Sequence, residues 1–199
     1  MPTIRPYAAG DGDALYDICL RTGADGEDAS AVVLDPRLLG SVYVGPYLAL
    51  EPGLAFVLTD GATVLGYVLG ALDTGEFERA CELTWWPALR ARHARSAVPP
   101  GSVDATLIDL IIAPPTTPRS VTSVYPSHLH IDLLPAAQGA GWVRALIETL
   151  RSALAAAGSP GVHLGVSPAN TRAIGFYRRL GFAVVAADPS GATMGAPIS

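Results

Sequence analysis

Short runs of apolar and β-branched residues, separated by clusters of small and polar residues, predict strands in both halves of the chain. These runs span 3–7, 54–58, 64–72, 127–134, 161–166 and 182–186, and we expect the last of them to be the final strand. The pair Asp60-Gly61 lies between the second and third runs. Because Asp-Gly favours a tight turn, these two runs are predicted to form an antiparallel hairpin.

Apolar positions three and four residues apart predict helices around these strands. Leu15, Ile18 and Cys19 place one helical face against a core, and Asp11 or Asp13 can cap that helix. Further helices are expected to begin at Pro36 and to span 76–93, 103–112, 138–157 and 170–180. Strands that alternate with helices indicate an α/β fold. No repeat or shift in composition divides the chain, so we expect one domain over residues 1–199.

Composition and charge narrow the class of protein. Half of the 199 residues are hydrophobic and only 16% are charged, so a sizeable core can form and wholesale disorder is excluded. A formal net charge of -5 without a segregated basic patch argues against a nucleic-acid or anionic-membrane partner. The amino terminus lacks a signal-peptide pattern, and no apolar run approaches the roughly 18 residues of a membrane span. We therefore expect a soluble, cytoplasmic protein.

The positions of cysteine and histidine indicate whether the chain forms disulfides or binds a metal. Cys19 and Cys81 are far apart and lie in helical patterns, so reduced and packed thiols are expected, in agreement with a cytoplasmic location. The histidines are His93, His128, His130 and His163. Because they do not combine with either cysteine into a recognised zinc spacing, no metal site is predicted.

A glycine-rich turn joins the predicted strand at 127–134 directly to the next helix. The segment is Leu134-Pro135-Ala136-Ala137-Gln138-Gly139-Ala140-Gly141-Trp142-Val143. Such a turn directs backbone N–H groups and the positive end of the helix dipole at one spot, where an anion can bind. It can equally be a turn that only starts a helix. Arg144 replaces the third glycine of a dinucleotide fingerprint, and a chain without lysine has no P-loop, so both are excluded.

The pattern Gln138-x-x-Gly141 after a strand that ends in proline resembles the pyrophosphate loop of the GCN5-related N-acetyltransferases, the GNAT family. Val143 stands where that family usually has glycine or alanine, and Ala140 where it often has a basic residue. A second segment is very similar to the family signature Asn-x-x-Ala-x-x-Phe-Tyr-x-x-x-Gly-Phe. Its matching residues are Asn170, Ala173, Phe176, Tyr177, Gly181 and Phe182. The two motifs occur in the family's order and cover the last third of the chain.

Segments nearer the amino terminus are similar to one branch of this family. They are Ile4-Arg5-Pro6-Tyr7, Tyr16-Asp17-Ile18-Cys19-Leu20 and Tyr67-Val68-Leu69-Gly70-Ala71. The branch comprises the acetyltransferase-like domain at the end of eukaryotic O-GlcNAcases and its free-standing bacterial relatives. Some of its members are thought to be degenerate. A catalytically inactive module that binds acetyl-CoA or another protein is therefore the alternative hypothesis.

The resemblance implies a GNAT fold, with a central twisted mixed sheet, helices on both faces and a helical insertion at about 74–126. It implies transfer of an acetyl group from acetyl-CoA to an amine, by direct attack in a ternary complex. In the family, the strand before the loop splays from its neighbour and binds the pantetheine, and the loop binds the pyrophosphate. The resemblance assigns the cofactor to Leu133, Leu134, Gln138, Gly139, Ala140, Gly141, Trp142, Val143, Asn170, Phe176 and Tyr177.

Two proton-transfer roles complete this prediction. The family's tyrosine, here Tyr177, can protonate the leaving thiolate; the alternative is a core aromatic on a helical stripe. Strand alternation puts His128, His130 and Asp132 on one face. Either Asp132 or His130 is the candidate base that removes a proton from the amine. The alternative is that these side chains only form hydrogen bonds to the helices that cover the strand. The sequence leaves the acceptor and the oligomeric state, a homodimer included, open.

Overall fold

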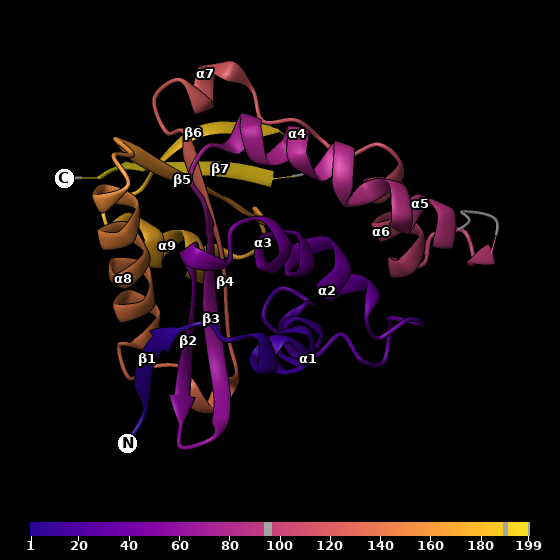
Figure 1. The fold of residues 1–199 in the computed structure, drawn as a ribbon, viewed down its shortest axis with the longest axis horizontal. Coiled ribbons are helices and arrows are strands. Elements are labelled where there is room, and N and C mark those ends of the chain that lie inside the picture. Colours follow the sequence, from indigo (N-terminus) through magenta and orange to yellow (C-terminus); the bar gives the residue numbers. More distant parts are fainter. Residues whose placement is uncertain (94–96, 189–190, 199) are drawn as a thin grey trace.

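The computed structural model describes residues 1–93, 97–188 and 191–198, and a seven-stranded mixed sheet lies at its centre (Figure 1). The strands are β1 (Thr3–Pro6), β2 (Ala55–Asp60), β3 (Thr63–Ala71), β4 (Ser127–Leu133), β5 (Gly161–Val166), β6 (Ala183–Asp188) and β7 (Gly191–Pro197). Their order is β1-β2-β3-β4-β5-β7-β6, and neighbours are antiparallel except β4 and β5, which are parallel. The predicted α/β class and the hairpin of β2 and β3 are confirmed.

β7 is absent from the predicted elements, and the expectation that the run ending at 186 is the final strand is wrong. β7 lies between β5 and β6 and pairs with both. Its sequence, Gly-Ala-Thr-Met-Gly-Ala-Pro, holds few residues of high β propensity, so it is the pairing on both sides that stabilises it. Gly195 is needed in this strand because a Cβ atom there would lie 2.7 Å from the ring of Tyr125.

Several short helices cover one face of the sheet. They are α1 (Gly12–Thr22), α2 (Leu38–Tyr43), α3 (Gly45–Leu50), α4 (Thr74–Thr84), α5 (Trp86–Arg92) and α6 (Val103–Ile112), and the single turn α7 (Arg119–Thr122) precedes β4. Leu15, Ile18 and Tyr67 are fully buried in the apolar cluster between these helices and the sheet. The predicted helix at 76–93 is interrupted at Trp85, because Pro87 has no N–H to donate and its ring disrupts a continuous helix.

Two further helices, α8 (Trp142–Ala156) and α9 (Thr171–Arg179), cover the other face, and Figure 1 shows α8 and α1 on opposite sides of the sheet. The prediction of helices on both faces is therefore confirmed. Leu146, Ile147 and Leu150 of α8 are fully buried. Gly70 of β3 lets α8 approach closely, since a Cβ atom there would lie 2.6 Å from Leu150. Within the described ranges, no helix is both long and apolar enough to cross a lipid bilayer.

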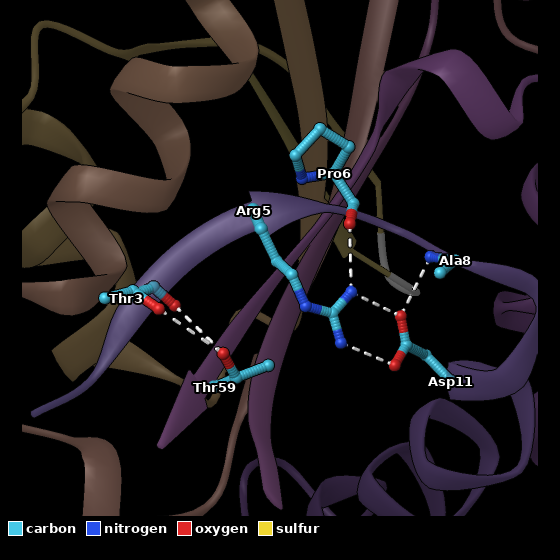
Figure 2. A network of polar contacts seen from close by, with 6 residues as sticks. All are labelled: Thr3, Arg5, Pro6, Ala8, Asp11 and Thr59. Carbon is cyan, nitrogen blue, oxygen red and sulfur yellow. Dashed lines mark hydrogen bonds and ion pairs between the residues drawn. The ribbon is translucent and has the colours of Figure 1, made fainter. Parts of the chain in front are cut away.

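Arg5 connects β1 to the start of α1 through a two-point ion pair with Asp11 (Figure 2). Each of two guanidinium nitrogens lies 2.7 Å from a carboxylate oxygen, and the N–H of Ala8 donates to the same carboxylate at 2.8 Å. The hydrogen bond from Arg5 is the main cause that lowers the pKa of Asp11. Asp11 does occupy the N-cap position of α1, but no side chain caps this helix. The expected cap by Asp11 or Asp13 is wrong, because Arg5 and Ala8 occupy the Asp11 carboxylate.

Candidate functional site

β4 and β5 separate part-way along the sheet, and the gap between them is the centre of the candidate site. Their parallel register holds two residue pairs, Ser127 with Val162 and His128 with His163. β4 stays paired with β3 as far as Leu133. Beyond His128, the two strands therefore face each other with unpaired backbone edges, where an extended ligand can add hydrogen bonds.

The register of β3 and β4 determines which backbone groups face this gap. The N–H of Leu134 donates to the carbonyl of Leu65 at 2.9 Å, and bonded residues alternate with non-bonded ones along an antiparallel pair. Ile131 and Leu133 therefore direct their backbone groups away from β3 and toward the gap. The side-chain amide of Gln138 donates to the Leu133 carbonyl at 3.1 Å. The Leu133 N–H and both backbone groups of Ile131 are left to meet a ligand.

The turn between β4 and α8 presents a set of backbone N–H groups. Gly139 and Gly141 have φ angles of 81° and 84°, which favour glycine, and a Cβ atom on either would meet no atom within 4 Å. Gly141 is the N-cap of α8, and no side chain caps this helix. In the part of the chain that the structure describes, the N–H groups of 139–144 have no bonded acceptor. Together with the helix dipole, they can hold an anion such as a phosphate group.

The side chains that follow this turn pack on the protein interior. Trp142 and Val143, in the first turn of α8, pack against the apolar cluster beneath that helix. Val143 is the second residue of the helix, so its N–H is one of the unbonded donors of the first turn despite its β-branched side chain. The N–H of Gln138, by contrast, donates to the carbonyl of Pro135 at 3.1 Å. The free donors of the turn therefore begin at Gly139.

Tyr177 lies on α9 within electrostatic reach of Asp132 on β4. Its ring meets those of Phe176 and Phe182 edge-on, with centroid distances of 5.7 Å. Burial, and then the charge of Asp132, raise the pKa of Tyr177 to about 12. Among the described residues, its hydroxyl has no hydrogen-bond partner. Asn170 begins this helix, and its Oδ1 accepts the N–H of Ala173 at 3.0 Å. The phenol is thus protonated at neutral pH.

A polar cluster lies on the face of β4 that α1 covers. The hydroxyl of Tyr67 donates to Oδ2 of Asp132 at 2.5 Å and lies 3.2 Å from Nε2 of His130. Nε2 of His130 is 3.1 Å from the same carboxylate oxygen. Cys19 completes the cluster: its Sγ, one ring nitrogen of His130 and one oxygen of Asp132 lie within 4.8 Å of one another. Both polar contacts fall on Oδ2, and no described residue forms a hydrogen bond to Oδ1.

The charges within this cluster follow from its burial. Burial opposes a charged imidazole, but the negative charge of Asp132 and the hydrogen bonds that the imidazole forms with Asp132 and Cys19 raise the pKa of His130 to about 10. Burial also raises the pKa of Tyr67, so its hydroxyl keeps its proton. Tyr43 stacks on the His130 ring at a centroid distance of 5.7 Å and holds its plane. The cluster therefore contains a protonated histidine, a carboxylate and a neutral phenol at neutral pH.

Comparison with known proteins identifies the family of this chain. A family model described as the acetyltransferase (GNAT) family matches residues 118–182. The crystal structure of SsHAT has 40% sequence identity, covers 100% of this chain and 98% of that one, and superimposes with a TM-score of 0.88. The chain belongs to the GNAT family. The predicted family and its fold, with helices on both faces of a mixed sheet, are confirmed.

Two further proteins are similar to this chain over most of its length. Rat O-GlcNAcase is 28% identical over 184 residues, which make up 90% of this chain and 20% of that protein. The chain therefore spans about a fifth of the length of the curated relatives it matches. The PaiA N-acetyltransferase of Thermoplasma acidophilum, solved in complex with coenzyme A, shares the fold with 13% identity, 99% coverage of both chains and a TM-score of 0.57. The predicted resemblance to the O-GlcNAcase branch is confirmed.

Not every residue that the sequence assigned to the cofactor has a backbone group free to bond a ligand. Both backbone groups of Leu134 are bonded, because its carbonyl also accepts the N–H of Ala137 at 2.9 Å. Residues that the sequence pattern did not single out for the site are Ile131, Cys19 and Tyr67. The strand pattern could have indicated Ile131, because this residue lies between the two candidate bases, His130 and Asp132, on the same strand. Cys19 and Tyr67 carry no such signal, because each resembles an ordinary core position of its own element.

His128 shares the face of His130 but belongs to an enclosed aromatic group. Its ring centroid lies 5.1 Å from that of Phe77 and 5.7 Å from that of His163. The Thr74 hydroxyl donates to a backbone carbonyl at 2.7 Å, so Nδ1–H of His128 donates to the Thr74 oxygen at 2.8 Å. Burial lowers the pKa of His128 to about 3 and also lowers that of His163. Both histidines are therefore neutral and structural.

We expect the free energy of unfolding to fall as the pH drops from about 6.5 toward 4. In this window the unfolded His128 binds a proton while the folded one, with a pKa of about 3, does not, which costs on the order of 1 kcal/mol per pH unit. The lowered pKa of folded His163 acts in the same direction. The double variant His128→Asn, His163→Asn keeps a donor near each Nδ1 position without titrating, so its stability should depend less on pH. Urea unfolding followed by circular dichroism at pH 7 and pH 5 measures this difference. An equal loss in both proteins contradicts the prediction.

Proposed function

We propose that this protein is an acetyl-CoA-dependent N-acetyltransferase that acetylates an amine by direct attack in a ternary complex. The observation that carries the proposal is the unpaired gap beside β4, with the free N–H groups of the turn at one end. Asp132 projects from β4 on one face of the sheet, and Tyr177 lies beneath the other, within reach of its charge. β4 therefore has backbone groups suited to acetyl-CoA and a carboxylate suited to the amine.

The turn and the gap have the chemistry of an acetyl-CoA site. The pyrophosphate would accept hydrogen bonds from the N–H groups of Gly139, Ala140, Gly141, Trp142 and Val143. The amide groups of the pantetheine arm would bond the backbone of Ile131 and Leu133, with Phe176 and Asn170 on the far wall. Gln138 contributes through its side chain, which fixes the turn to the end of β4. When bound, acetyl-CoA supplies the activated acetyl group.

Acetyl transfer forms a C–N bond and breaks the C–S bond of the thioester, and protons must move at both atoms. An alkylammonium has to lose a proton before it attacks. We assign Asp132 to receive this proton, directly or through water, because Oδ1 is open whereas His130 is already protonated. Tyr177 gives its proton to the leaving thiolate and regains one, by way of solvent, from the new amide nitrogen. His130 then acts as a positioning residue for the Asp132 carboxylate.

Substitution Gly141→Glu tests the cofactor site. The variant places a bulky acid beside the proposed pyrophosphate and strains a left-handed position, so acetyl-CoA affinity should fall at least about tenfold. Gly158→Glu is the matched control, because Gly158 has a φ angle of 85°, the same open surroundings, and lies at the opposite end of α8. Calorimetric titration with acetyl-CoA, with desulfo-CoA and NAD as comparison ligands, measures the affinity.

Three outcomes separate the hypotheses. Weakened binding in Gly141→Glu alone supports the cofactor site, and acetylation of any amine in a screen of primary amines then supports the enzyme. Binding of acetyl-CoA without turnover of any amine would favour the inactive cofactor-binding module. Equal losses in Gly141→Glu and Gly158→Glu, or no binding to the unmodified protein at millimolar acetyl-CoA, would overturn the proposed function.

A further inference from the structure

The polar cluster beside β4 has a second chemical property that acetyl transfer does not require. A thiol, an imidazole and a carboxylate converge on one point: Sγ of Cys19, a ring nitrogen of His130 and an oxygen of Asp132 lie within 4.8 Å of one another. The imidazole Nε2 and the carboxylate Oδ2 are 3.1 Å apart. Two ligands bound to one small cation are separated by about this distance, because metal–nitrogen and metal–oxygen bonds are about 2.0–2.2 Å long.

We propose that Cys19, His130 and Asp132 bind one zinc ion, which releases the protons of the thiol and of the imidazolium to solvent. Sulfur, nitrogen and oxygen are the three donor types that zinc accepts, and three protein ligands leave a fourth position for water or a substrate amine. The three residues come from α1 and β4, which the fold packs face to face. The linear spacing of cysteine and histidine contains no zinc motif, and the site exists only because of this packing.

Neighbouring side chains hold the donors in place. The hydroxyl of Tyr67, which is fully buried, donates to Asp132 at 2.5 Å, and the ring of Tyr43 stacks on His130 with an interplanar angle of 25°. Groups of this kind orient the ligands of established metal sites. The sulfur lies deepest, since Cys19 is 2% exposed, while the side chains of His130 and Asp132 are 26% and 20% exposed. An ion can thus approach from the side of the nitrogen and oxygen donors.

Zinc at this position would oppose the proposed acetyl transfer. It would bind Oδ2 of Asp132, and its positive charge would lower the basicity of Oδ1 in the same carboxylate, which we assign to receive the proton of the amine. This consequence rests on the proposed function, whereas binding of the ion does not. Metal binding and enzymatic activity therefore need separate measurements.

The binding experiment uses the full chain, stripped of metal by a chelator that is then removed. Calorimetric titration with zinc chloride gives affinity and stoichiometry, and cobalt chloride gives a thiolate-to-cobalt absorption band if Cys19 is a ligand. Cys19→Ser is compared with Cys81→Ser, because both cysteines are free and 2% exposed, and only Cys19 lies in the cluster. Asp132→Asn is a second ligand variant of nearly unchanged shape, and thermal unfolding verifies that each variant is folded.

We expect one zinc ion per chain, an affinity at least tenfold weaker in Cys19→Ser and in Asp132→Asn, and an unchanged affinity in Cys81→Ser. The cobalt band should be lost in Cys19→Ser alone. Absence of stoichiometric zinc binding, or equal losses in the two cysteine variants, would overturn the proposal. If zinc binds as expected and no amine is acetylated by the metal-free protein, the proposed function fails while the zinc site stands.

Discussion

Replacement of Tyr177 with phenylalanine is expected to lower kcat by about 10²–10⁴-fold, the usual contribution of a general acid, while the Kd for acetyl-CoA stays within a few-fold of the original. The substitution removes one hydroxyl from a ring that Phe176 and Phe182 hold edge-on, so the packing of α9 should persist. Because that hydroxyl has no partner among the described residues, no hydrogen bond within the protein is lost. The deficit therefore reports on chemistry and not on folding.

Tyr47→Phe is the matched control for this experiment. Tyr47 packs against Phe77 with a centroid distance of 4.7 Å, on the face of the sheet away from α9, and burial raises the pKa of its phenol too. The control should keep kcat. Because the pKa of Tyr177 is raised to about 12, its own ionisation should produce no loss of activity up to about pH 10. Steady-state kinetics across pH 6–10 for both variants decide the point, and an unchanged kcat in Tyr177→Phe would remove the tyrosine from the mechanism.

The geometry of the turn between β4 and α8 could be anticipated because its residues are contiguous in sequence. Local geometry determines what Gly139 and Gly141 do, since left-handed backbone and an uncapped helix end need only the turn itself. The same holds for Asn170, whose capping bond spans three residues. Short-range geometry of this kind follows from the local order of residue types, whereas the assignment of a cofactor to the turn came from the family resemblance.

Strand alternation predicted that His130 and Asp132 share a face, but the rest of the polar cluster beside β4 could not be predicted in the same way. Tyr67 meets His130 and Asp132 across 63 and 65 residues of chain, and Cys19 reaches them from a separate helix. These contacts depend on the register of β3 with β4 and on how α1 packs, which no local pattern encodes. β7 was missed for a related reason, since its two partner strands supply most of its stability and its own composition supplies little.

Asp132→Asn is expected to lower kcat by about 10²–10⁴-fold at neutral pH and to leave acetyl-CoA affinity unchanged. The amide keeps the size of the side chain, and its oxygen can still accept the hydrogen bond of Tyr67, but it cannot receive a proton from an ammonium ion. Without the carboxylate, the cause that holds the pKa of His130 near 10 is removed, and burial favours the neutral imidazole. The variant therefore exchanges a charged pair for a neutral one.

That exchange lets His130→Gln discriminate between the two candidate bases. If Asp132 receives the proton, His130→Gln keeps the carboxylate and should lose much less kcat than Asp132→Asn. If the histidine is the base, the newly neutral imidazole in Asp132→Asn should retain activity, and His130→Gln should be the more damaging change. The comparison is made as kcat at saturating acetyl-CoA over pH 6–9. If His130→Gln loses more kcat than Asp132→Asn, the base is not Oδ1 of Asp132. It is then the imidazole of His130, which Tyr43 and Tyr67 contact.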